Sequence, residues 1–260
     1  MALKTIGFFG DSFCEYAVHQ HSVDNNYKTY IQQLKEHYNL EILNLGMGGS
    51  SVWDVLINQL NPLIKANTVP DVCVFSWTHS GKLFHRTSRS LHASGVLYGD
   101  NQKKFDWFAK TYPKAGYNFF DKTIYEAAKQ YFMHLYDQEK ADIEHVALMQ
   151  YIDNNVLSTL NSKIIHLWSF GSHNFNMPNG WHPDNISYPY IWKNGTTILP
   201  SLMSLSMPGY PWPVQPAIDD RPNHLEGDKN DTVFEWIKYA IEHEKTMDYT
   251  KDVIKRWDAQ

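Results

Sequence analysis

Three polar segments of this chain carry residue types that can turn a serine into a nucleophile. Gly10-Asp11-Ser12 ends a short apolar run, a glycine-rich segment at 44–51 follows a second run, and His224 precedes the last helical pattern. A serine attacks a carbonyl carbon only when a base takes its proton and positioned N–H groups stabilise the oxyanion that forms. The three segments together therefore contain what acyl transfer needs, provided that the fold brings them to one place.

The segment around His224 supplies a base and carboxylates that can orient it. Asp219 and Asp220 come shortly before the histidine, where a carboxylate fixes the imidazole tautomer and stabilises the imidazolium. We expect Asp220 to have this role, with Asp219 as the alternative. In the glycine-rich segment, the N–H groups near Gly49 can point outward from a turn without side chains, which suits an oxyanion hole.

Each segment also has a simpler explanation. Gly-Asp-Ser is a common cap where a strand turns into a helix, and the glycine-rich loop can serve only for tight turning. The loop can also bind phosphate, although it lacks the lysine of a P-loop and the spacing of a dinucleotide-binding loop. A histidine in a polar loop is most often a surface residue. Catalysis is therefore favoured only by the three segments together.

These segments must be positioned by the elements around them, which the hydrophobic pattern predicts. Short apolar runs predict strands at residues 6–10, 40–45, 72–77, 163–170 and 197–202. Helical spacing predicts helices at 27–38 and 52–64, one bent helix or two within 122–157, and a last helix at 232–244 that closes the chain. We expect one α/β domain over residues 1–260, a flavodoxin-like three-layer α/β/α fold with a doubly wound parallel sheet of about five strands. A loop-rich insertion is expected at about 80–120, over the carboxyl ends of the strands.

With the segments in this order, the chain resembles the SGNH (GDSL) hydrolase superfamily. Gly10-Asp11-Ser12-Phe13 is similar to the family's first block, which provides the nucleophile and one backbone N–H. The segment at 44–51 is similar to the second block, whose oxyanion-binding glycine matches Gly49, and the segment ending in His224 is similar to the fifth. The resemblance implies a serine esterase that forms an acyl-enzyme on Ser12 and needs no cofactor. It implies small-molecule or glycan esters as substrates, such as carbohydrate O-acetyl esters.

The resemblance fails at the third block. In the family this block ends its strand with Gly-x-Asn-Asp, and the asparagine donates to the oxyanion, but residues 75–80 contain no asparagine. Thr78, His79 or the backbone N–H that follows can stand in as the donor. Trp77 and Arg86 are expected to contact the substrate, Arg86 by supplying charge. In other serine hydrolases, the loss of one such donor lowers the rate by about 10²- to 10³-fold.

A second departure concerns the partner of the base. The family's aspartate lies three residues before the histidine, a position that Arg221 holds here. Asp142 and His145 do have this spacing. They fall inside a predicted helix, where such pairs are common surface decoration, so we expect them to be a decoy.

Composition and charge exclude several other classes of function. The net charge is −5 without a lysine or arginine run, so no nucleic-acid partner is expected. No window approaches the roughly 20 apolar residues of a membrane span, and the N-terminus has no signal-peptide pattern, which predicts a soluble protein, cytoplasmic or virion-associated. Cys14 and Cys73 are too few for a disulfide framework and are expected to be reduced. The histidine spacing fits no metal-binding pattern, so no metal is expected.

Two rival hypotheses come from other functional classes. A carbohydrate-binding or virion or cell-surface interaction module can keep this fold without activity, and the missing asparagine favours it. Aromatic residues in the loops fit either sugar contacts or ordinary packing. A flavodoxin-like nucleotide binder that uses the loop at 44–51 is the third hypothesis. The acyl group, the alcohol and the oligomeric state are not identified by the sequence.

Overall fold

The computed structural model contains a six-stranded parallel sheet. It describes residues 3–15, 28–86, 90–92, 96–97, 122–170, 188–206, 225 and 227–258. The strands are β1 (Thr5–Gly10), β2 (Glu41–Asn44), β3 (Val72–Trp77), β6 (Lys163–Trp168), β7 (Thr196–Leu199) and β8 (Met247–Asp248). Their order is β2-β1-β3-β6-β7-β8, and all neighbours run parallel. Because the chain moves outward from β1 first to one side and then to the other, the sheet is doubly wound.

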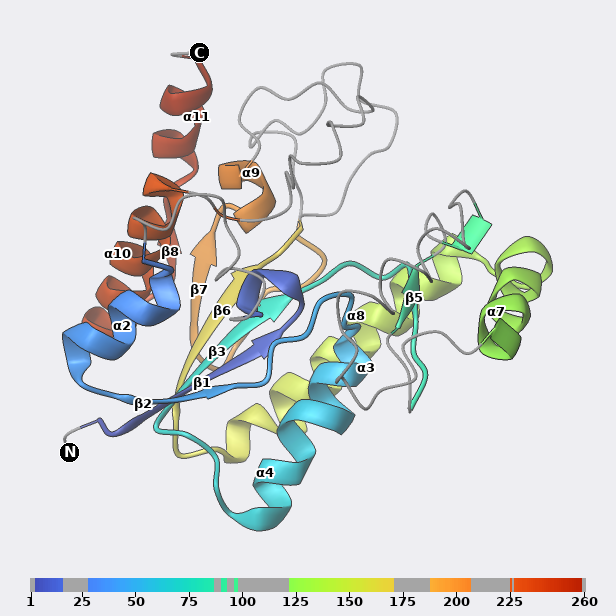
Figure 1. The fold of residues 1–260 in the computed structure, drawn as a ribbon, viewed down its shortest axis with the longest axis horizontal. Helices are drawn as coiled ribbons and strands as arrows, with labels where there is room; N and C mark the ends of the chain where they lie inside the picture. Colours follow the sequence, from blue (N-terminus) through green and yellow to red (C-terminus); the bar gives the residue numbers. More distant parts are fainter. Residues whose placement is uncertain are drawn as a thin grey trace.

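Helices cover both faces of the sheet (Figure 1). One face carries α2 (Tyr30–Tyr38), α10 (Asp228–His243) and α11 (Thr250–Asp258). The other face carries α3 (Val52–Asp54), the π-helical segment η2 (Val55–Leu60), α4 (Asn61–Ala66) and α8 (Gln138–Asn155). This three-layer α/β/α arrangement confirms the fold class expected from the sequence.

The central strand β3 is buried along its whole length and separates two cores. Successive side chains of a strand point to opposite faces of the sheet. Val72 and Val74 therefore join the core under α2 and α10, whereas Cys73, Phe75 and Trp77 join the core under η2 and α8. Burial on both faces requires the continuous apolar runs from which these strands are predicted.

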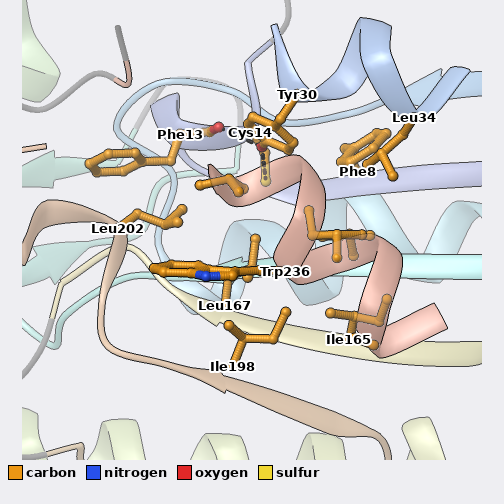
Figure 2. Packing of buried hydrophobic residues seen from close by; sticks show 14 of the residues in the cluster. Phe8, Phe13, Cys14, Tyr30, Leu34, Ile165, Leu167, Ile198, Leu202 and Trp236 are labelled. Atoms are coloured by element: carbon orange, nitrogen blue, oxygen red, sulfur yellow. Dashed lines mark hydrogen bonds between the residues drawn. The ribbon is translucent and has the colours of Figure 1, made fainter. Parts of the chain in front are cut away.

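The first core packs the sheet against α2 and α10 (Figure 2). Phe8 of β1 and Ile165 of β6 lie in the same cluster as Tyr30 of α2 and Trp236 of α10. The hydroxyl of Tyr30 donates to the carbonyl of Phe13 at 2.7 Å. This core therefore reaches the turn that follows β1.

The described part of the insertion at 80–120 has structure of its own. β4 (Lys82–Leu83) and β5 (Leu91–His92) pair antiparallel. Leu91 and Val96 pack with Tyr125 and Phe132 of α7 (Lys122–His134) in a third, small core. The insertion is thus anchored on α7 and is more than a loop.

Two elements after α10 differ from the sequence prediction. β8 and α11 follow this helix, so the expectation that the helix at 232–244 closes the chain is wrong. A strand of two residues is too short to show an apolar period. Most residues of α11 are polar, and among its described side chains Val253 is a buried apolar one. The pattern at 122–157 forms the two helices α7 and α8, and the pattern at 52–64 forms three consecutive segments.

Cys14 and Cys73 are both buried and unpaired, which confirms the expectation of reduced, structural thiols. Burial raises the pKa of each thiol to about 12. Within the described ranges, no helix has both the length and the apolar character that crossing a bilayer requires.

Candidate active site

Ser12 lies at the carboxyl end of β1, in the middle of the sheet. Gly10 ends this strand with φ of 134°, and a Cβ there would overlap the carbonyl oxygen of Ser76 on β3. Only glycine adopts this turn without strain. Asp11 then caps the 3₁₀ helix η1 (Ser12–Cys14) by accepting the Phe13 N–H at 3.1 Å. The half-buried Ser12 is therefore the first residue of a short helix, at the sheet edge where α/β folds bind ligands.

The glycine-rich loop after β2 packs against η1 and the residue that follows it. Asn44 Nδ2 donates to the Cys14 carbonyl, and the Gly48 N–H donates to Glu15 Oε2, both at 2.6 Å. Gly49 has φ of 84°, a left-handed conformation that favours glycine. The fold thus brings the first and second polar segments together at one edge of the sheet.

The backbone N–H groups of Ser12 and Gly49 are the predicted oxyanion donors. In the ranges that the structure describes, neither group donates a hydrogen bond. Both residues are half-buried, so each N–H can donate to a ligand or to solvent. Such donors are what a developing oxyanion needs.

Gln59 links the end of β1 to the glycine-rich loop by hydrogen bonds. The sequence analysis did not predict this role of Gln59. The Gly10 N–H donates to Gln59 Oε1 at 2.7 Å. Gln59 Nε2 donates to the Gly10 carbonyl at 3.1 Å and to Ser50 Oγ at 3.2 Å. A signal was available, because Gln59 lies in the apolar stripe of the predicted helix, one turn after the buried Leu56. A polar side chain in such a stripe must find buried partners.

Asp11 is a buried carboxylate at the carboxyl edge of the sheet. Its Oδ1 accepts hydrogen bonds from the Phe13 N–H at 3.1 Å and from Ser169 Oγ at 2.8 Å. Its Oδ2 accepts none within the described residues and lies 4.0 Å from Lys82 Nζ. Burial raises the pKa of Asp11, although the charge of Lys82 and the hydrogen bond from Ser169 act in the opposite direction. The partner of this carboxylate is thus a lysine that the sequence analysis did not single out.

The residues after β3 hold the two side chains predicted to replace the missing asparagine. The hydroxyl of Thr78 is fully buried, faces Asp11 and makes no hydrogen bond of standard geometry in the described part of the chain. His79 is half-buried, and its Nδ1 accepts the Gly81 N–H at 3.2 Å. Thr78 is therefore inside the protein, whereas His79 lies at the surface of a cavity.

This cavity has a volume of about 200 Å³ and opens beside β4. Side chains from the insertion and from α3, α7 and α8 line it, among them Trp53, His79, Lys82, Tyr131, Tyr136 and His145. Polar groups and aromatic rings are mixed in its wall, as in sites that bind small polar molecules.

His145 is buried, contrary to the expectation of a surface pair with Asp142. Asp142 is exposed and accepts a hydrogen bond from Ser80 Oγ. The ring of His145 faces the Thr78 carbonyl, and its Nε2 has no hydrogen-bond partner among the residues described. Burial lowers the pKa of His145 to about 4. The physical reason is its place on α8, since it shares the inward face with the core residue Met149.

Trp77 is a core residue, so the expectation that it contacts substrate is wrong. Its side chain is fully buried, stacks on Phe75 and Trp192, and donates its indole N–H to His166 Nδ1 at 2.9 Å. As the last residue of a doubly buried strand it points into the core under α8. Arg86 is exposed.

His166 is also part of this core. Its Nε2 bonds to the Asn194 carbonyl at 2.7 Å, and its ring stacks on Trp192. Burial lowers the pKa of His166 to about 4. Within the described residues, no three histidine, cysteine or acidic side chains are grouped as metal ligands would be.

The predicted base His224 and its partners Asp219 and Asp220 lie outside the described residues. The residue that follows the base, Leu225, is described and belongs to the core under α2 and α10. Its carbonyl accepts a hydrogen bond from Asn230 Nδ2 at 3.1 Å. The chain is therefore anchored in this core directly after the base.

No family model and no curated protein sequence matches this chain. Among solved structures, the chain is similar to the acetylxylan esterase Axe2 from Geobacillus stearothermophilus, with 14% identity, 68% of this chain and 67% of that chain covered, and a TM-score of 0.32. It is also similar to the acetyl xylan esterase AlAXEase, with 15% identity, 96% of this chain and 80% of that chain covered, and a TM-score of 0.32. Similarity at this level assigns no activity to the chain, and its fold class stands on the strand order and the two helical layers.

Proposed function

We propose that this protein is a serine esterase that hydrolyses an ester through an acyl-enzyme on Ser12. His224 is the proposed general base, and Asp220 is the carboxylate that orients it. The N–H groups of Ser12 and Gly49 are the proposed oxyanion donors. The proposal is supported by the family resemblance, by the half-buried position of Ser12 after β1, and by the packing of the glycine-rich loop beside it.

One chain of hydrogen bonds carries the proposal, because it links the residues next to the proposed nucleophile and base. The carbonyl of Phe13, which directly follows the nucleophile, accepts the hydroxyl proton of Tyr30 at 2.7 Å. The Tyr30 N–H donates to Asn230 Oδ1, and Asn230 Nδ2 donates to the carbonyl of Leu225, both at 3.1 Å. Leu225 directly follows the base. Segments more than two hundred positions apart are thus tied together through two side chains.

In the proposed reaction, the imidazole of His224 takes the proton of Ser12 Oγ as this oxygen bonds to the ester carbonyl carbon. The two backbone N–H groups hold the oxyanion of the tetrahedral intermediate. When the C–O bond to the alcohol breaks, the imidazolium gives its proton to the departing alcohol. Water then attacks the acyl-enzyme by the same steps, which releases the acid and restores the serine.

We propose a small-molecule or glycan ester as the substrate, with carbohydrate O-acetyl esters as the first class to test. The cavity beside β4 holds about 200 Å³, less than the roughly 300 Å³ at the lower end for drug-sized ligands. Its wall combines Lys82 and His79 with the ring of Trp53, which is 45% exposed. These features suit one small polar ring.

A non-catalytic carbohydrate-binding or interaction module is the second candidate. It is favoured by the third-block residues, because the Thr78 hydroxyl is buried against Asp11 and no asparagine follows β3. The two candidates differ in whether Ser12 is reactive.

A fluorophosphonate probe, which labels activated serines, tests the proposal. We expect labelling and p-nitrophenyl acetate hydrolysis by the wild type, and a rate at least about 10⁴-fold lower in Ser12→Ala and His224→Ala. Ser158→Ala is the matched control and should change neither, since Ser158 also lies in a 3₁₀ helix, η3 (Leu157–Thr159). Activity on acetylated glycans then tests the substrate class. Folded wild-type protein that is not labelled would favour the interaction module.

A further inference from the structure

Lys82 is a buried lysine that no part of the predicted site accounts for. It comes from β4, in the insertion after β3, and its side chain is 8% exposed. Its Nζ donates to the Ser50 carbonyl at 2.9 Å and lies 4.0 Å from Asp11 Oδ2. Burying an ammonium group is unfavourable unless the charge is paired or used. Its place at this edge of the sheet therefore needs an explanation.

Both partners of Lys82 are sequence neighbours of the proposed oxyanion donors. Asp11 directly precedes Ser12, and Ser50 directly follows Gly49. Neighbouring Cα atoms are only about 3.8 Å apart across a trans peptide. The ammonium thus contacts a sequence neighbour of each donor.

Among the described residues, Lys82 Nζ makes one hydrogen bond, which leaves further N–H groups for a ligand. An ammonium carries three donors. The Ser50 carbonyl accepts one of them, and the 4.0 Å separation from Asp11 is too long for a hydrogen bond. Because Lys82 also lines the cavity beside β4, a molecule in that cavity can reach it.

The charges around Lys82 favour its protonated form. Burial lowers the pKa of Lys82, and the carboxylates of Asp11 and Asp54 act against this shift. His92 and His145 also face the ammonium, but burial lowers the pKa of each to about 4, so both are neutral near pH 7. The titratable groups described around Lys82 therefore add no competing positive charge at that pH.

We infer that Lys82 donates to the oxyanion formed at Ser12, in place of the asparagine that the third block lacks. The inference rests on the proposed function. As Oγ bonds to the carbonyl carbon, the C=O electron pair moves onto the carbonyl oxygen, and the ammonium stabilises this negative charge together with the two backbone N–H groups. No proton leaves Lys82, and no covalent bond forms to it. A fixed cation in a site with little water stabilises an anion strongly.

Removing the charge of Lys82 tests the inference. We expect Lys82→Met to lower kcat for p-nitrophenyl acetate by about 10²- to 10³-fold, with KM within about threefold of the wild type. Lys82→Arg keeps the charge and should be at least about tenfold faster than Lys82→Met. A folded Lys82→Met with kcat close to that of the wild type would overturn the inference.

Lys163→Met is the matched control at the opposite edge of the sheet. Lys163 starts β6, and its Nζ donates to the Ile241 carbonyl at 2.9 Å and pairs with Glu244. It therefore shares the carbonyl and carboxylate contacts of Lys82, but lies away from Ser12. We expect its kcat to stay within about twofold of the wild type. An equal loss of kcat in both variants would assign the effect to stability.

Failure of this inference and failure of the proposed function give different results. If Ser12→Ala abolishes labelling while Lys82→Met keeps full activity, the serine esterase stands and the role of Lys82 is wrong. If Ser12→Ala keeps full activity, the proposed function itself is wrong. Should Lys82→Met not fold, a crystal structure of the wild type with a phosphonate bound to Ser12 decides. An adduct oxygen about 3 Å from Lys82 Nζ is expected, and a separation beyond about 5 Å would overturn the inference.

Discussion

Two aspartates lie at opposite edges of the sheet, in opposite surroundings. Asp71, just before β3, accepts hydrogen bonds from the Lys4 N–H at 2.8 Å and from the N–H and hydroxyl of Thr5 at 2.9 and 3.2 Å. These bonds lower the pKa of Asp71, and the bond from the Lys4 N–H has the largest effect. Asp11, just after β1, is buried, with an Oδ2 that accepts no hydrogen bond from the residues described, and burial raises its pKa.

The difference separates polar groups that are fully hydrogen-bonded from polar groups that are not. At the amino edge, Asp71 and Thr5 satisfy each other, since the Asp71 N–H also donates to Thr5 Oγ1 at 3.0 Å. At the carboxyl edge, Asp11, Thr78 and His145 each have a buried polar atom without a hydrogen bond in the described part of the chain. Unpaired buried atoms lower stability, and proteins keep them mainly where binding or catalysis uses them.

The turn at Gly10 should be the most sensitive point of the carboxyl edge. Gly10→Ala places a methyl group on a residue with φ of 134° and against the Ser76 carbonyl, so we expect the free energy of unfolding to fall by about 3 kcal/mol or more. Urea unfolding measures this loss. Gly81→Ala is the control, because the nearest atoms to its new Cβ lie at 3.5 Å, and it should change stability by less than about 0.5 kcal/mol. Similar losses in both variants would contradict the steric argument.

Two buried histidines extend the comparison between paired and unpaired groups. Both ring nitrogens of His166 are bonded, to Trp77 and to the Asn194 carbonyl, whereas His145 Nε2 has no partner among the described residues. We expect His166→Leu to lower the free energy of unfolding by about 2–3 kcal/mol at pH 7.5, because the buried Trp77 indole and the half-buried Asn194 carbonyl both lose a hydrogen bond. His145→Leu should cost less than about 1 kcal/mol. Chemical denaturation measures both losses. A larger loss for His145→Leu than for His166→Leu would contradict the argument from hydrogen bonding.

The same two variants should also change how stability depends on pH. Burial lowers the pKa of His145 and of His166 from 6.5 to about 4, so between these values the unfolded chain binds protons that the folded chain does not. The free energy of unfolding therefore falls as the pH drops from 6.5 toward 4, by about 3 kcal/mol for each histidine. In each leucine variant, the fall in the free energy of unfolding between pH 6.5 and 4 should be smaller by the contribution of the replaced histidine. An unchanged slope would show that burial does not keep that histidine neutral.

The smallest expected effect is at the amino edge. Asp71→Asn removes the charge from three hydrogen bonds, but the carboxylate is near solvent, so we expect a loss of only about 1 kcal/mol at pH 7. Because the pKa of Asp71 is lowered in the folded protein, its contribution is present above the ordinary value of 3.8 and is lost as the pH falls through the folded pKa. Wild type and variant should thus converge in urea unfolding once the pH lies below the folded pKa of Asp71. If the unfolding free energies of wild type and Asp71→Asn still differ at that pH, the effect of the substitution is due to packing rather than to the lost charge.

The strands were predictable because doubly buried strands require uninterrupted apolar runs. Five of the six strands of the parallel sheet overlap predicted ranges, and β8 was missed because two residues show no apolar period. Lys82 was not predictable in the same way. From sequence, a lysine in an irregular insertion is expected to be a solvent-exposed charge. In the structure, Lys82 belongs to β4, which pairs with β5, and it is buried beside Asp11.

The sequence by itself determined the alternation of strands and helices, the glycine that ends β1 and the serine that follows it. These features depend on local periodicity and backbone sterics, which a short stretch of chain contains. Only the tertiary structure decided which polar groups meet at the carboxyl edge, Gln59 with Gly10 and Lys82 with Asp11. Such pairs join residues 49 and 71 positions apart, and their contact follows from how helices and insertion pack on the sheet rather than from local preference.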